Sequence, residues 1–157
     1  MQAERRHSPP PSEEWLGSPY VWLRGLPPVA VAREARGILL AWLRTVGIHA
    51  SDTNGPASLL VLPDGRNAAV KVSLRWAEGR YHFQQIKDWD YSLGLLYGLS
   101  PNCAHLWAVP RAELLAHSKP QHSEASRVLA VYPDDPPPWL AKYGGDLDDA
   151  ARVLGGT

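Results

Sequence analysis

The chain has 157 residues, 45% of them apolar, and its 16 acidic and 16 basic residues give a formal net charge of zero. This length suits one domain with a hydrophobic core and is short for two. The charge balance excludes a global basic field that attracts nucleic acid, although a local patch is compatible with it. A single cysteine, Cys103, excludes an internal disulfide, and no apolar run approaches the roughly 20 residues that cross a bilayer. We therefore expect a cytoplasmic protein with no membrane segment.

The N-terminal part of the chain divides into a tail, an aromatic segment and a helix. Residues 1–14 are polar and proline-rich, which predicts a disordered tail before a domain over 15–157. The segment 15–26 places aromatic residues between Gly and Pro, which predicts irregular structure that packs on the domain. A proline pair then opens a helix over 28–46, because apolar residues recur on one face and proline suits the first turn. Gly47 is the expected stop of that helix.

The middle of the chain predicts a β-hairpin with one unusual residue. Two apolar runs, 58–62 and 68–74, flank the turn sequence PDGR, which is typical of a strand–turn–strand unit. Lys71 lies between two valines of the second strand. A lysine in such a strand is costly unless it has a partner or a task. The amide-rich stretch that follows predicts one or two helical turns over 83–90.

The rest of the chain alternates short strands and helices. The predicted elements are an edge strand at 48–50, strands at 92–99, 104–109 and 128–132, a helix at 110–117, a loop at 118–125, a rigid linker at 133–138, and terminal helices at 139–143 and 146–154, the last capped by Asp146. This order predicts an α/β domain with a mixed central sheet flanked by helices. Its core spans about 29–132, and its C-terminal helices lie within 136–154.

Several site chemistries lack their sequence signatures. The six histidines are scattered without an HExxH pattern, and a single cysteine makes a structural zinc site improbable. The glycine-rich loops of nucleotide-binding folds are missing. Cys103 sits in a Pro-Asn-Cys turn without a supporting motif, which indicates an inert thiol.

The hairpin with an inner lysine resembles the core of the PD-(D/E)xK nuclease superfamily, the restriction-endonuclease-like fold. In that superfamily, an Asp on one strand and an acidic residue two positions before a lysine on the next strand bind divalent metal. The likeness extends through YHFQQIK at 81–87, GLSP at 98–101 and HLWAVPR at 105–111, which are similar to FxFQQIR, LGISP and hxWxIPK motifs of a bacterial branch. The resemblance covers about 29–154 and implies a single restriction-endonuclease-like domain.

The metal ligands of this superfamily are missing at their expected positions. Ala69 stands two residues before Lys71, where the pattern has an acidic residue, and Ser58 stands at the position of the strand Asp. Neither side chain can hold Mg²⁺, which prefers carboxylate oxygens. The resemblance therefore implies a degenerate member for which no cofactor is expected. If the protein is active, Glu34 and Asp52 would be migrated ligands of Mg²⁺.

The sequence favours a catalytically inactive protein that binds DNA, or that serves as a partner subunit in a DNA-processing or defence complex. An active Mg²⁺-dependent endonuclease, with Lys71 and Glu34 as catalytic residues, is the alternative, and a protein-interaction module that uses the N-terminal tryptophans is a third. Homodimers are an expectation carried by the resemblance. A structural alternative pairs Lys71 with Glu34 and makes the two glutamines caps of element ends. The predicted DNA-contacting residues are Lys71, Gln84, Gln85, Lys87, Arg75 and Arg80.

Overall fold

The computed structural model describes residues 15–53, 59–76 and 78–155, so the predicted tail over 1–14 lies outside the described residues. The strands are β1 (Ser51–Asp52), β2 (Leu59–Val61), β3 (Asn67–Leu74), β4 (Tyr81–Ile86), β5 (Leu93–Leu99), β6 (Ala104–Pro110), β7 (Lys119–Gln121), β8 (Ser123–Val131) and β9 (Gly144–Asp146). The helices are η2 (Val21–Gly25), α2 (Pro28–Thr45), α3 (Arg111–His117), α4 (Pro138–Ala141) and α5 (Leu147–Leu154). None of the helices within the described ranges is long and apolar enough to span a membrane.

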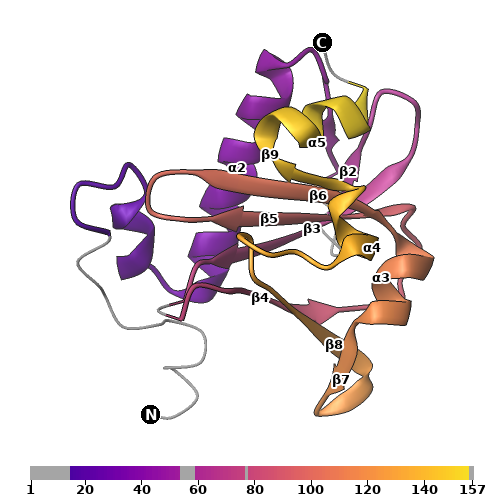
Figure 1. Cartoon of the computed structure of the whole chain (residues 1–157). Coiled ribbons are helices and arrows are strands. Elements are labelled where there is room, and N and C mark those ends of the chain that lie inside the picture. The colour runs from indigo at the N-terminus through magenta and orange to yellow at the C-terminus, as the bar shows by residue number, and fades with distance from the viewer. Residues whose placement is uncertain (1–14, 54–58, 77, 156–157) are drawn as a thin grey trace.

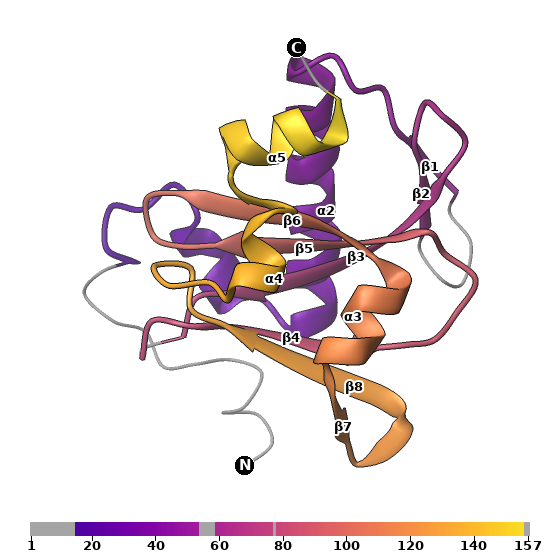
Figure 2. The same ribbon diagram turned by 45° about the vertical axis from the view of Figure 1, so that its right-hand side comes forward.

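The strands form two sheets that pack face to face. Six strands form a mixed sheet in the order β1-β2-β3-β5-β6-β9, in which β3 and β5 are parallel and their other neighbours antiparallel. The second sheet has the order β4-β8-β7. Helix α2 crosses one face of the six-stranded sheet and the second sheet lies on the other (Figures 1 and 2). The predicted α/β class with a mixed central sheet is confirmed, and the narrower restriction-endonuclease-like assignment stays a prediction.

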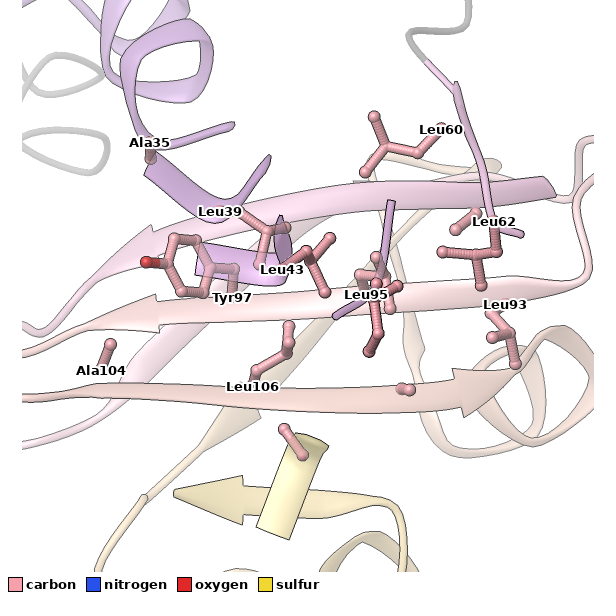
Figure 3. Close-up of a cluster of buried hydrophobic side chains, with 14 of the residues drawn as sticks. Ala35, Leu39, Leu43, Leu60, Leu62, Leu93, Leu95, Tyr97, Ala104 and Leu106 are labelled. Atoms are coloured by element: carbon pink, nitrogen blue, oxygen red, sulfur yellow. The ribbon is translucent and has the colours of Figure 1, made fainter. Parts of the chain in front are cut away.

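Two hydrophobic clusters hold these layers together. The first lies between α2 and the six-stranded sheet, where Leu39 and Leu43 of the helix meet Leu95, Tyr97 and other residues of the strands (Figure 3). The second lies between the two sheets. Strand β5 is buried along its whole length because it contributes to both clusters. Each fully buried Leu stabilises the fold by roughly 1.5–3 kcal/mol.

Several sequence-based predictions are confirmed at the level of elements. Helix α2 begins at Pro28 as expected and ends at Thr45, with Gly47 in the left-handed conformation. The segment before it packs on the domain, since Trp15 and Leu23 are buried. The carboxylate of Asp146 accepts a hydrogen bond from the Asp149 backbone N–H at 2.9 Å, so it caps α5 as predicted.

Three predictions of secondary structure are wrong. Residues 83–90 do not form helical turns; Tyr81–Ile86 is β4, in which every second side chain faces the core until a bulge breaks the alternation. The stretch 118–125 is not a loop but contains β7 and the start of β8, joined by a tight turn at His122, whose φ is 68°. The edge strand is Ser51–Asp52 instead of 48–50.

The two glycines at 144 and 145, expected only to separate helices, start β9. This strand pairs with β6 through Leu106 and Trp107. A side chain at Gly144 would collide with the Leu106 carbonyl oxygen, so only glycine permits this close approach of the two backbones.

A buried polar cluster joins the second sheet to the end of β5. The Tyr81 hydroxyl lies 2.6 Å from Ser100 Oγ and 2.7 Å from His105 Nδ1, and both contacts are hydrogen bonds. Burial lowers the pKa of His105, with Arg75 contributing in the same direction and the charges of Asp134 and Asp146 opposing it. The structure therefore favours a neutral imidazole at this position.

This cluster predicts a loss of stability in mild acid. Because the folded-state pKa of His105 lies below the unfolded value of about 6.5, the unfolded chain binds more protons between the two values. The contribution of His105 to the free energy of unfolding is fully present above about pH 6.5 and is lost as the pH falls towards the folded-state pKa. Urea unfolding of the wild type at pH 7.5 and 5.5 is expected to show this loss, and His105→Asn is expected to reduce it. Equal pH dependence in both proteins would contradict the assignment.

Candidate functional site

Strand β3 places Lys71 on the face of the sheet that meets the second sheet. Val70 and Val72 pack against the α2 cluster, so the side chains of the intervening residues point the opposite way. Ser73 marks this opposite face, because its Oγ accepts a hydrogen bond from the His82 backbone N–H of β4 at 2.9 Å. Ala69, which is 7% exposed, lies on the same side as Lys71, as the strand alternation predicts.

The second half of β3 forms an open edge within the described part of the chain. Strand β2 pairs only with residues 67–69 of β3, whereas β5 pairs with 68–74. Residues 70–74 are therefore paired with β5 on one side, and no described strand is paired with them on the other. Ser58, which stands where the superfamily has its strand Asp, lies outside the described residues.

A pocket of about 290 Å³ lies against this open edge and contains Lys71. All five residues 70–74 line it, although their side chains alternate between two faces, which shows that the pocket follows the strand edge. One wall comes from η2 and the first turns of α2, and the other from β4 and the turn before it. Besides residues 70–74, the lining residues are Leu23, Pro28, Val29, Val31, Ala32, Trp76, His82, Gln84 and Gln85.

Lys71 is a largely buried cation in a pocket without an acidic lining residue. Burial lowers the pKa of its ammonium group, and the charge of Lys87 lowers that pKa further. Among the described residues no ion pair joins Lys71 to a carboxylate. The alternative that pairs Lys71 with Glu34 is therefore wrong for the described structure, in which Glu34 pairs with Arg33 at 3.3 Å. An anion that enters the pocket would supply the charge that the lining lacks.

A β-bulge in β4 places two glutamines beside Lys71. Phe83 and Ile86 pair with Leu129 and Arg127, so Gln84 and Gln85 together oppose one residue of β8. Gln85 adopts a φ of 54°, an uncommon value for a residue other than glycine. Bulges often redirect side chains next to functional sites. Both glutamines line the pocket and are part of a strand, so the idea that they cap element ends is wrong.

Two aromatic residues complete the polar wall and were missed in the sequence. The ring of His82 lies 4.9 Å from that of Trp76, and both line the pocket. The alternation of buried and half-buried residues along β4 would have placed His82 on the same side as Gln84 once the strand was recognised. The apolar wall from α2 has no comparable local signal, because it depends on how the helix packs on the sheet.

The other predicted DNA-contacting cations do not line the pocket. Lys87 follows β4 and acts on Lys71 through its charge. Arg80 pairs with Glu78 at 2.6 Å and lies over the ring of Trp76, which places it beside the pocket rim. Arg75 directly follows β3, and its backbone N–H donates to the Leu99 carbonyl.

The two candidate migrated carboxylates lie apart from Lys71. Glu34 is half-exposed on α2 and does not line the pocket. Asp52 pairs with Arg36 at 2.8 Å and lines a neighbouring pocket on the α2 side of the edge. In the described ranges, no group of three or more His, Cys, Asp or Glu side chains is placed to hold a metal ion. The described residues thus assemble a cationic and amide-lined pocket, without the two-carboxylate arrangement.

Comparison with known proteins adds no family assignment. The chain matches no protein-family model, and no curated protein matches it.

Proposed function

We propose that this protein is a non-hydrolytic member of the restriction-endonuclease-like class, which binds DNA phosphates at the Lys71 pocket without cleaving them. The observation that carries the proposal is the placement of a desolvated lysine in a pocket whose lining has no carboxylate. A cation in that position costs folding free energy, so it is best explained by a ligand of opposite charge.

The rest of the pocket suits a phosphate group. Amide N–H groups of Gln84 and Gln85 can donate to phosphate oxygens, while the lysine provides a charge-assisted contact. In the superfamily that the chain resembles, hydrolysis uses a hard metal ion held by oxygen ligands, and Ala69 cannot provide such a ligand. A cytoplasmic location, and a role as the non-catalytic subunit of a DNA-processing complex or as a homodimer, belong to the same proposal.

The direct test combines binding and cleavage in one series. Supercoiled plasmid and a labelled duplex are titrated with the protein at low ionic strength, with and without Mg²⁺ or Mn²⁺, because phosphate contacts weaken steeply with salt. We expect retardation of the duplex and intact plasmid. Metal-dependent cleavage that is abolished by Lys71→Ala and by Glu34→Ala would overturn the proposal in favour of an active endonuclease. No binding at any salt concentration would favour a protein-interaction module.

A further inference from the structure

The open edge of β3 presents backbone groups as well as side chains. The Arg75 N–H donates to the Leu99 carbonyl of β5, and the Asn67 carbonyl accepts from the Ser92 N–H, both at 2.9 Å. The odd-numbered residues of β3 therefore direct their backbone polar groups towards β5. The N–H and C=O of Val70 and Val72 point the other way, towards the edge where no described strand pairs with them.

Two pockets flank this edge and form one groove. The Lys71 pocket and a second pocket of about 390 Å³ share four lining residues, namely Val29, Ala32, Val70 and Val72. The second pocket lies on the α2 side, and its other lining residues are Gly37, Leu40, Arg33 and the ion-paired Arg36 and Asp52. On its α2 side the groove thus combines the apolar residues Val29, Ala32 and Leu40 with charged side chains, and on its β4 side it is cationic and amide-lined. Val29, which is 80% exposed, marks its rim.

We propose that this groove binds an extended protein segment that adds to β3 as an edge strand, with an acidic side chain directed at Lys71. Main-chain hydrogen bonds to Val70 and Val72 would provide affinity, and the two sides of the groove would provide specificity. Side chains of a strand alternate between faces, so a residue whose carboxylate meets Lys71 has neighbours that point towards α2. Those neighbours meet Val29, Ala32 and Leu40, which favours an apolar–acidic–apolar pattern in the partner.

Two features of the groove other than Lys71 suit a peptide. A strand edge offers alternating N–H and C=O groups, which pair with another backbone and have no counterpart in a phosphodiester chain. The apolar residues of the α2 side, Val29, Ala32 and Leu40, also contribute to binding only when they bury apolar side chains. The inference shares Lys71 with the proposed function but does not depend on DNA binding, and it implies that the peptide and DNA compete for this lysine.

The test uses fluorescein-labelled peptides and fluorescence anisotropy. The probe is the peptide SGTVEVTGS, and its matched control carries glutamine in place of the glutamate. Ala32→Trp fills the groove from an exposed position of α2. Ala41→Trp is its control, because position 41 is also exposed and lies nine residues further along the helix, on the opposite side.

We expect the glutamate peptide to bind the wild type and Ala41→Trp equally, and to bind Ala32→Trp at least about tenfold more weakly. Lys71→Met is expected to weaken binding of the glutamate peptide about tenfold and to affect the glutamine peptide much less, since only the glutamate forms an ion pair with the ammonium group. Equal affinity for the two peptides, or binding that Ala32→Trp does not affect, would overturn the inference. If the protein binds a DNA duplex but not the peptide, the inference fails and the proposed function stands. If it binds the peptide but not DNA, the proposed function fails and the inference stands.

Discussion

Replacing Gly98 with alanine is expected to lower the free energy of unfolding by about 3 kcal/mol, near the upper end of the usual cost of overpacking a core. Gly98 lies in β5, and a Cβ atom there would lie 2.6 Å from Cδ2 of the Tyr81 ring and closer still to two other ring atoms. The ring cannot move aside easily, because it is fully buried and its hydroxyl is hydrogen-bonded to Ser100 and His105. The two sheets must therefore separate locally to accept one methyl group.

Urea unfolding of the Gly98→Ala variant measures this cost, and Gly37→Ala provides a matched control. Gly37 is exposed in α2, and a Cβ atom there meets nothing within 4 Å. Alanine is favoured over glycine inside a helix by roughly 0.5–1 kcal/mol, so the control is expected to gain stability. A Gly98→Ala protein as stable as the wild type would show that the contact between β5 and Tyr81 is looser than described.

The Lys71→Met variant is expected to be more stable than the wild type at neutral pH, by about 1–3 kcal/mol. Burial lowers the pKa of Lys71, which means that the folded environment disfavours its charge, and no described carboxylate compensates for it. Methionine fills similar space without the charge. Such a gain on removal is typical of a residue retained for function at a cost in stability.

The difference in stability between Lys71→Met and the wild type depends on pH, because the pKa of Lys71 is lowered in the folded state. The folded-state pKa of Lys71 lies below the unfolded value of about 10.5, so the unfolded chain binds more protons between the two. The wild type therefore gains stability as the pH rises through this window, and the advantage of Lys71→Met shrinks. Denaturant unfolding at pH 7 and 9.5 tests this, with Lys119→Met on exposed β7 as a control expected to change little. A destabilised Lys71→Met protein would indicate that the lysine has a structural role.

The elements that were predicted correctly have regular patterns over their whole length. Helix α2 repeats apolar residues at helical spacing, and β5 is apolar almost throughout. Strand β4 was missed because its bulge at Gln85 interrupts the alternation, and β9 was missed because its pairing depends on a glycine backbone close to Leu106. In both cases tertiary packing overrides a local pattern.

The candidate site was predictable only in part, because local patterns identify some of its residues and tertiary packing supplies the others. Lys71, Gln84 and Gln85 were identified in the sequence and do lie together in the pocket, while Glu34 and Asp52 do not join them. The apolar wall contributed by the start of α2 could not be predicted, because it depends on the position of the helix against the open strand edge. A local pattern identifies an unusual residue, but its surroundings depend on contacts between distant segments.

The most direct test of the central claim, that Lys71 serves anion binding and not folding, is the DNA affinity of Lys71→Met measured beside its stability. In a low-salt titration with a labelled duplex, we expect Lys71→Met to bind about tenfold more weakly than the wild type, while Lys119→Met, an exposed lysine outside the pocket, keeps most of the affinity. Unfolding by urea is expected to show that the Lys71→Met protein is folded and at least as stable as the wild type. Unchanged DNA affinity in this folded variant would contradict the claim.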